Sequence, residues 1–246
     1  MIFVIYPCMD NYLFDNDYSA DILKWMRKIE ELNLQLNATP EQIDSLQQEI
    51  ITNQDSGLAY FFAYHFDYKN HLMQKIVIDN NDYKYAFLFA QNIRYADIKT
   101  LQKIVVNSNK IKYICKFACF VVSANIQPLE KLIIKSKNVK YAHMYLKYVK
   151  GANVKKFKQI IFDSKKPRYL YELAKHINKQ SELRLIEDLI IESKSLTYIR
   201  LLAQNIKKAN VEKLEQAILD LENVEQIKKF AKKVKRSKIK RFLLVL

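Results

Sequence analysis

Glycine and proline are scarce in this chain, which has 2 Gly and 4 Pro among 246 residues. All-β folds with many tight turns need both residues at those turns. Phosphate-binding loops of the GxGxxG or GxxxxGK type need clustered glycines, whereas Gly57 and Gly151 are isolated. The composition therefore excludes both classes and favours a helical protein.

Cysteines and long apolar runs are also few. Cys8, Cys115 and Cys119 are too few for a disulfide framework. Cys115 and Cys119 lie one helical turn apart, but no further Cys or His pair completes a metal site, so we interpret them as core residues. No segment approaches the roughly 18 uninterrupted apolar residues of a membrane span. The apolar start, MIFVIYPCM, lacks the preceding basic residues of a signal peptide. We expect a cytoplasmic protein (in the host cell if it is viral) with no membrane partner, no metal and no cofactor.

A repeat of about 28 residues runs through most of the chain. Its anchors, spaced by 27, 28, 28, 28, 29 and 28 residues, are Phe62-Ala63, Phe89-Ala90, Phe117-Ala118, Tyr145-Leu146, Leu173-Ala174, Leu202-Ala203 and Phe230-Ala231. Apolar residues recur four and one before the Ala-type anchor, at the anchor, and three after it, as in Ile114, Phe117, Ala118 and Val121. This spacing predicts an amphipathic helix, here called helix A, of about 12 residues in each copy.

Capping residues predict where the helices of each repeat begin. Good N-cap residues stand eight before the anchor at Asp55, Asp82, Asn138, Ser195 and Asn223, and Pro167 fits the first helical position of another copy. A second set (Asp97, Asn125, Asn153 and Asn210) predicts a second helix, helix B, which ends near Ser108, Ser136, Ser164 and Ser193. Each repeat is a helical hairpin too small to bury its own apolar face, so neighbouring repeats must stack.

The predicted fold is therefore an all-α α-solenoid of about seven two-helix repeats. Thr39-Pro40-Glu41-Gln42 is a capping box that opens the first helix B. We interpret residues 1–38, with a helix near residues 20–36, as an atypical acidic N-terminal cap, and residues 39–246 as the basic repeat array. The apolar tail Ile239–Leu246 either closes the array or leaves an edge for a partner.

The recurring [A/G]A[N/D][I/V]xxLxxxIIxS followed by xYxxxFAxxV resembles tandem helical-hairpin repeats of AT-rich bacteria, their phages and giant viruses. It is similar, in architecture, to HEAT-like and armadillo-type solenoids over about residues 39–240. These motif residues are caps and core positions, so the resemblance implies a binding scaffold and assigns no chemistry. HEAT-like DNA glycosylases share this architecture, but no residue here matches their catalytic acid.

Positive charge is concentrated in the array. The net charge of +15 divides into −7 for residues 1–55 and +22 for residues 56–246. Basic residues recur six before, one after and five after the Ala-type anchor, at Lys84, Lys112, Lys140 and Arg168, at Lys147, Lys175 and Lys232, and at Lys179, Lys208 and Arg236. At 100° per residue these three offsets fall on one side of helix A and predict a basic ridge. Lys233 and Lys235 extend it into the basic C-terminal run.

A tyrosine follows the first basic residue of the ridge in four copies, at Tyr85, Tyr113, Tyr141 and Tyr169. One interpretation is a boundary tyrosine with a packed ring and a solvated hydroxyl. The other is a Lys/Tyr ladder that follows a phosphate backbone and stacks bases. The high lysine content is also typical of proteins from AT-rich genomes. The basic C-terminal run is also typical of the solvated face of a terminal helix.

The sequence does not contain the residue sets of an active site. The histidines form no HExxH pair, and we interpret the adjacent Glu30-Glu31 and Glu187-Asp188 as solvated charge. The leading hypothesis is a non-enzymatic solenoid that binds nucleic acid or a nucleoprotein through phosphate contacts. The alternative is a protein-interaction scaffold or a phage- or virus-type inhibitor of a host complex, bound through the acidic cap or the apolar tail. A nucleic-acid repair enzyme is a third interpretation.

Overall fold

The computed structural model describes residues 27–29, 31, 39–66 and 70–239. Its described residues form helices and turns and no strand. The predicted N-terminal cap falls almost wholly outside these residues, as do residues 240–246 of the apolar tail.

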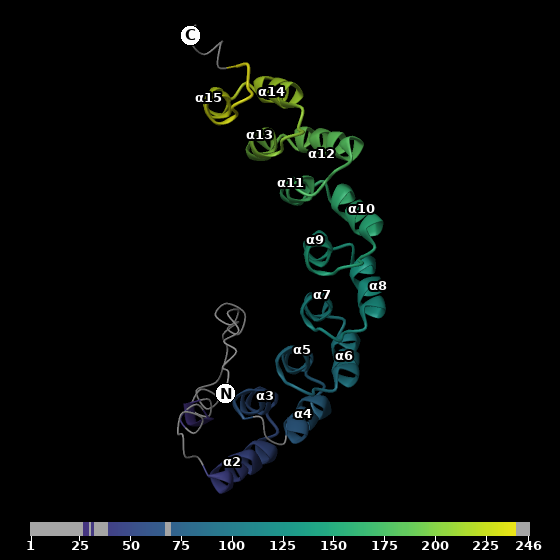
Figure 1. Cartoon of the computed structure of the whole chain (residues 1–246), viewed down its shortest axis with the longest axis vertical. Coiled ribbons are helices and arrows are strands. Elements are labelled where there is room, and N and C mark those ends of the chain that lie inside the picture. Colours follow the sequence, from purple (N-terminus) through teal and green to yellow (C-terminus); the bar gives the residue numbers. More distant parts are fainter. Residues whose placement is uncertain (1–26, 30, 32–38, 67–69, 240–246) are drawn as a thin grey trace. The chain divides into compact units, whose positions relative to one another are not determined.

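The described helices alternate along the chain as the repeat predicts. Their bounds are α2 (Pro40–Asn53), α3 (Ser56–His65), α4 (Asn70–Asp79), α5 (Tyr83–Asn92), α6 (Ile98–Asn107), α7 (Ile111–Phe120), α8 (Ile126–Ser136), α9 (Val139–Tyr148), α10 (Val154–Ser164), α11 (Pro167–Ala174), α12 (Gln180–Glu192), α13 (Leu196–Asn205), α14 (Val211–Leu219) and α15 (Val224–Lys233) (Figure 1). Odd-numbered helices from α3 onward are the predicted helices A, and even-numbered helices are the helices B.

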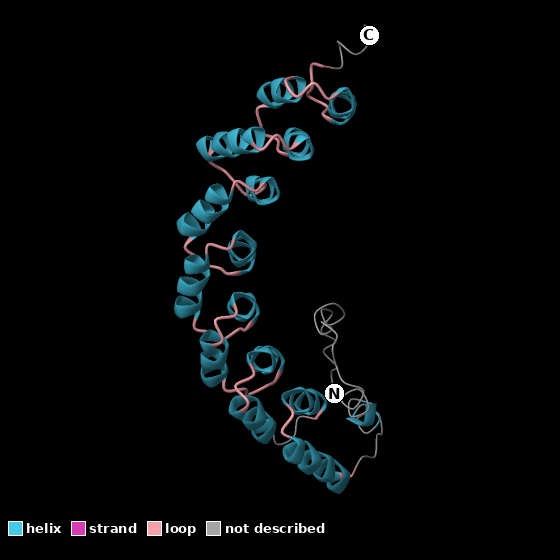
Figure 2. Cartoon of the chain, turned by 180° about the vertical axis from the view of Figure 1, so that it is seen from behind, coloured by secondary structure: helices cyan, strands magenta, loops and turns pink. Residues whose placement is uncertain are grey.

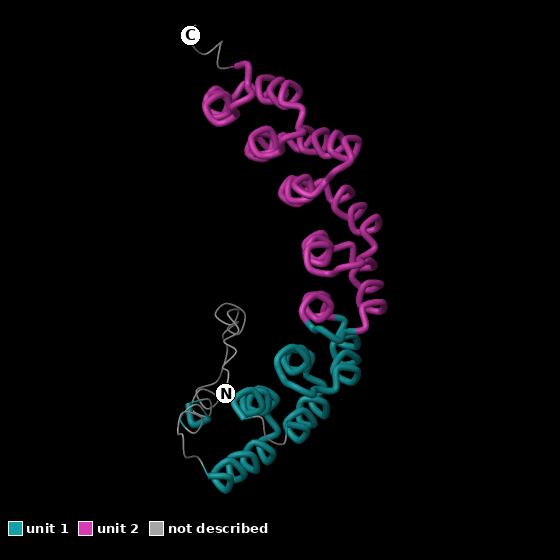
Figure 3. The backbone as a smooth tube through the Cα atoms, viewed as in Figure 1, with its two compact units in different colours: residues 1–109, 121–124 teal, residues 110–120, 125–246 magenta. Residues whose placement is uncertain are grey.

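Two compact units divide the chain (Figure 3). Unit 1 comprises residues 1–109 and 121–124, and unit 2 comprises residues 110–120 and 125–246. In unit 1, α3 packs on α4 and α5 on α6, and α3 also packs on α5. In unit 2, each odd-numbered helix from α7 packs on the next odd-numbered helix, while α8 packs on α10 and α12 on α14. Within each unit the hairpins therefore stack into two layers of helices, which confirms the α-solenoid (Figure 2).

The anchor residues form the core between the layers. Phe62, Phe89, Phe117, Tyr145 and Phe230 are fully buried. Helix A is shorter than predicted, with 10 residues in six copies and 8 in α11. In five copies the apolar residue three after the Ala-type anchor is the C-cap residue and is extended, as in Ile93 (φ −96, ψ 125) and Val149 (φ −102, ψ 113). The exception α11 ends earlier, with Lys175 as its C-cap residue.

Most of the predicted caps are confirmed. The side chains of Asp55, Asp82, Asn138 and Asn223 accept backbone N–H groups at the starts of odd-numbered helices. Asp97, Asn125, Asn153 and Asn210 do the same for even-numbered helices. Thr39 and Gln42 form the predicted capping box. Ser195 is an N-cap residue but makes no side-chain capping bond.

Left-handed residues at the turns into the odd-numbered helices explain the scarcity of glycine. The residues with positive φ at this position are Gln54, Asn81, Asn109, Lys137, Lys165, Lys194 and Glu222, spaced like the anchors. Serine side chains brace the same turns: Ser136 donates to the carbonyl of Ile133 (2.6 Å) and accepts the N–H of Asn138 (3.2 Å). The repeat thus reverses the chain without glycine.

Candidate nucleic-acid interface

Unit 2 distributes its charge unequally between its two layers of helices. The odd layer (α7, α9, α11, α13 and α15) contains ten basic and two acidic residues. The even layer (α8, α10, α12 and α14) contains seven basic and eight acidic residues. The two acidic residues of the odd layer pair locally, Glu172 with Lys175 (2.8 Å) and Glu225 with Lys229 (2.6 Å). The odd layer is therefore the basic side of unit 2.

The first set of predicted ridge residues occupies the second position of its helices. Lys84 lies there in α5 of unit 1, and Lys112, Lys140 and Arg168 lie there in α7, α9 and α11 of unit 2. The last three are exposed. A cation in the first turn opposes the helix dipole and costs roughly 0.3–1 kcal/mol. Helix stability alone therefore does not account for this basic position.

Each of these cations lies over the ring of the tyrosine that follows it. The Nζ atoms of Lys84, Lys112 and Lys140 are 5.4, 5.7 and 5.9 Å from the centroids of Tyr85, Tyr113 and Tyr141. The guanidinium of Arg168 is 5.9 Å from the centroid of Tyr169. All four tyrosines are half-buried. The cation–π contact contributes about 0.5–1 kcal/mol at exposed sites and limits the motion of the cation.

The helical register predicted for the residues five after the Ala-type anchor is wrong. Because the odd-numbered helices end at least three residues earlier, an angle of 100° per residue does not apply to Lys179, Lys208 or Arg236. Lys179 is the N-cap residue of α12, and Lys208 lies in the turn before α14. Of the residues one after the anchor, Lys147 and Lys232 lie in α9 and α15, and Lys175 is the C-cap residue of α11.

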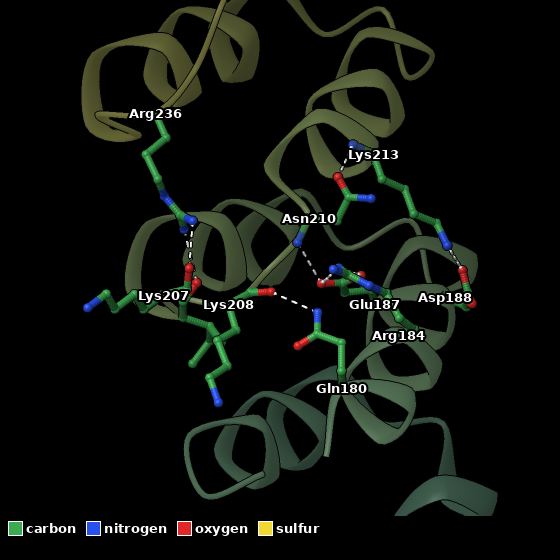
Figure 4. Close-up of polar contacts among 10 residues, drawn as sticks. Gln180, Arg184, Glu187, Asp188, Lys207, Lys208, Asn210, Lys213 and Arg236 are labelled. Atoms are coloured by element: carbon green, nitrogen blue, oxygen red, sulfur yellow. Dashed lines mark hydrogen bonds and ion pairs between the residues drawn. The ribbon is translucent and has the colours of Figure 1, made fainter. Parts of the chain in front are cut away.

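In the basic C-terminal run, Arg236 has a structural contact that the sequence did not predict. Its guanidinium donates to the carbonyls of Ala203 (3.1 Å), Ile206 (3.0 Å) and Lys207 (2.7 Å), at the C-terminal end of α13 (Figure 4). Arg236 thus joins two successive hairpins. Lys232 and Lys233 lie in the last turn of α15, where a cation complements the helix dipole, and Lys235 is exposed in the turn that follows.

Glu187 is fully buried, so its interpretation as solvated charge is wrong. It accepts two hydrogen bonds from Arg184 (2.7 and 2.6 Å) and one from the N–H of Asn210 (2.8 Å), the N-cap residue of α14 (Figure 4). Its neighbour Asp188 is half-exposed and pairs with Lys213. Glu31 is exposed, whereas Glu30 lies outside the described residues.

Equivalent acceptors recur in other even-numbered helices, at what we call the acceptor position. Gln74 accepts the N–H of Asp97 (2.8 Å), Glu130 that of Asn153 (3.3 Å), and Glu215 that of Ile239 (2.6 Å). For Gln74, Glu130 and Glu187 the sequence signal is a Gln or Glu 23 residues before the N-cap Asn or Asp of the next helix B, whereas Glu215 accepts from Ile239, 24 residues later. Three of the eight acidic residues of the even layer of unit 2 thus accept backbone N–H groups inside the fold.

A small titratable cluster lies beside the ridge on α9 and α11. Burial lowers the pKa of His143, against the raising effect of Glu172, while Lys147 lowers it further. The hydrogen bond with Lys175 lowers the pKa of Glu172 and raises that of Lys175. Among the residues that the structure describes, no group of three His, Cys, Asp or Glu side chains is placed to hold a metal ion. Cys115 is buried, with its Sγ atom 4.0 Å from that of Cys119.

Comparisons with protein-family models, curated proteins and solved structures give no match to this chain. In the part of the chain that the structure describes, no helix has the length and apolar character to cross a membrane.

Proposed function

We propose that this chain is a non-enzymatic α-solenoid whose basic ridge binds nucleic acid, alone or in a nucleoprotein, through phosphate contacts. The ridge of unit 2 is defined by Lys112, Lys140, Lys147, Arg168 and Lys175 on or at the ends of the odd-numbered helices. The excess of ten basic over two acidic residues in the odd layer is the observation that carries the proposal.

The repeat geometry suits a polyanion. Packed helices lie about 8–10 Å apart, so each repeat adds basic side chains at a regular interval. A single nucleic-acid strand of a duplex places a phosphate about every 3.4 Å, so about three phosphates span each repeat. Lysine and arginine at this spacing neutralise part of the backbone and read no base edge, which predicts binding that tolerates sequence changes and weakens with salt.

A salt titration tests the proposal. With about five phosphate contacts, the slope of log K against log salt for duplex DNA is about −4.5, so the affinity falls by a few hundred-fold between about 50 and 200 mM salt. DNA and RNA, single- and double-stranded, are each titrated by fluorescence anisotropy. Absence of binding at the lowest salt, or tight binding that does not weaken with salt, would overturn the proposal.

Matched charge reversals locate the interface. We expect K112E/K140E/K147E in the odd layer to weaken binding by at least about 100-fold and to reduce the salt slope by about 3. K131E/K155E/K156E reverses three exposed lysines of the even layer with the same change in net charge, and we expect an effect below about fivefold. Equal losses in the two variants would show that net charge, and not the ridge, governs binding.

The alternative function, a protein-interaction scaffold or inhibitor, depends on the acidic N-terminal segment and the apolar tail. Residues 1–26 and 240–246 lie outside the described part of the chain.

A further inference from the structure

Two aromatic side chains are exposed at the ends of neighbouring helices in the odd layer. Phe120 is the last residue of α7 and is 37% exposed, and Tyr148 is the last residue of α9 and is 48% exposed. Their ring centroids are 5.3 Å apart and their planes are inclined by 55°. The two rings therefore form one apolar surface that faces solvent.

Positive charge lies beside this surface. The Nζ atom of Lys147 is 5.1 Å from the centroid of the Tyr148 ring, and Lys150 is exposed in the turn after α9. Lys116 precedes Phe120 by one helical turn on α7, with its Nζ atom 5.5 Å from the centroid of the Tyr113 ring. Neither α7 nor α9 contains an acidic residue. A ligand that covers the rings must therefore be compatible with several cations.

The rings lie at a fixed distance from the ridge cations of the same helices. Phe120 follows Lys112 by eight residues and Tyr148 follows Lys140 by eight. Eight residues of α-helix span about 12 Å and a little more than two turns. Each helix thus presents a cation near its start and an aromatic ring at its end, so a row of cations and the aromatic pair lie side by side.

The exposed pair is better placed to stack with a base than the tyrosines that follow the ridge cations. Tyr113 and Tyr141 are half-buried, and each has a lysine over its ring. Phe120 and Tyr148 are more exposed, and Lys147 lies over only one of them. Aromatic side chains next to a basic groove are the usual stacking surfaces for unpaired bases.

From this juxtaposition we infer that the ligand of the ridge is single-stranded nucleic acid, with unpaired bases stacked on Phe120 and Tyr148 and the adjacent phosphates bound by Lys147 and Lys150. The inference rests on the proposed function. In a duplex the base faces are already stacked on one another, so the rings would meet phosphate and sugar and gain nothing from their π-faces. In a single strand the bases are free to turn toward the rings.

The test uses the full chain and an oligonucleotide of about 12 nucleotides with 2-aminopurine at its centre, as single-stranded DNA, single-stranded RNA and duplex DNA. The variant F120L/Y148L removes both π-faces and keeps apolar side chains and every charge. The matched control is Tyr95→Leu in unit 1, where the ring is 84% exposed and lies beside Arg94. Circular dichroism verifies that all variants remain folded.

We expect F120L/Y148L to weaken single-strand binding by about ten- to a hundred-fold, with duplex binding changed by less than about twofold and the salt slope unchanged. 2-Aminopurine fluorescence should be quenched by the wild type and by Tyr95→Leu, but not by F120L/Y148L. If the leucine variant binds both strand forms as the wild type does, the inference fails while the proposed function stands. If none of the single-stranded or duplex oligonucleotides binds with an affinity that falls as salt rises, the proposed function itself fails. If single strands do bind, a difference in affinity between single-stranded DNA and single-stranded RNA identifies the preferred strand.

Discussion

The two layers of unit 2 are built from the same hairpins but use their charged residues differently. Two carboxylates of the even layer, Glu187 and Glu215, are buried and accept N–H groups from the following hairpin. Odd-layer cations such as Lys140 and Lys147 are exposed, and each lies over the ring of the tyrosine that follows it. The buried carboxylates therefore contribute to the stability of the fold, whereas the exposed lysines contribute little to it.

The removal of a buried even-layer carboxylate is the test of this comparison with the largest expected effect. Glu187→Ala leaves the N–H of Asn210 and the guanidinium of Arg184 without their acceptor, and we expect a loss of about 2–4 kcal/mol in the free energy of unfolding. Glu187→Gln keeps an acceptor oxygen and should lose about half as much. Urea unfolding followed by circular dichroism measures both. Asp188→Asn, beside it on the helix, is the control, with an expected loss below about 1 kcal/mol. Similar losses at both positions would contradict the assignment of Glu187.

The next challenge concerns a basic residue outside the odd-numbered helices. Arg236→Ala removes three hydrogen bonds to carbonyls at the end of α13, and we expect it to lower the free energy of unfolding by about 1–2 kcal/mol. Lys235→Ala, its exposed neighbour, should have almost no effect on stability. Both variants should bind nucleic acid within about threefold of each other. A greater loss of binding in Arg236→Ala than in Lys235→Ala, at equal stability, would indicate that Arg236 contacts nucleic acid directly.

A smaller effect is expected at the left-handed turn between the layers. Lys137 has a φ of 49°, a conformation that costs a residue with a side chain about 1–2 kcal/mol. Lys137→Gly removes this cost but adds flexibility to the unfolded chain, so we expect a net gain of about 0.5 kcal/mol. Lys137→Ala removes the same charge and keeps the strain, which makes it the control. A gain in the alanine variant as large as in the glycine variant would attribute the effect to charge.

The smallest effect is a pH dependence at the edge of the odd layer. Burial lowers the pKa of His143 below its ordinary value of 6.5, so the unfolded chain binds the proton more tightly than the folded chain. Stability from this group is therefore full above about pH 6.5 and decreases as the pH falls to the folded pKa. His143→Gln should flatten this part of the pH profile of the urea midpoint. If the urea midpoint of His143→Gln depends on pH as that of the wild type does, the pH dependence does not come from His143.

The helices and their caps could be predicted because their signals are local. The stripe through Phe117 and Ala118 repeats within two helical turns, and Asn153 caps a helix that begins at the next residue. The lengths of the odd-numbered helices were overestimated because the apolar stripe continues into the C-cap residue, where Val149 is extended. Periodicity alone does not distinguish a helical position from a buried C-cap.

The contacts of the candidate site that the sequence analysis missed are not local. Glu187 meets an N–H that lies 23 residues away, and Arg236 meets carbonyls about 30 residues away, in the previous hairpin. Neither partner shows in a pattern of hydrophobicity or charge. The exposure of Phe120 and Tyr148 also depends on packing, because a ring at the last position of a helix is buried or exposed according to the helix beside it.

The acceptor position also links successive hairpins of unit 2. A hydrogen bond from one hairpin to the next makes the formation of the second hairpin easier once the first has formed, as in any chain of nearest-neighbour units. At the step from α10 to α12 this bond is absent from its usual place, because the acceptor position holds Lys158, which pairs instead with Glu182 at 2.6 Å. An ion pair that reaches solvent weakens as salt rises, so the link between these two hairpins depends on ionic strength.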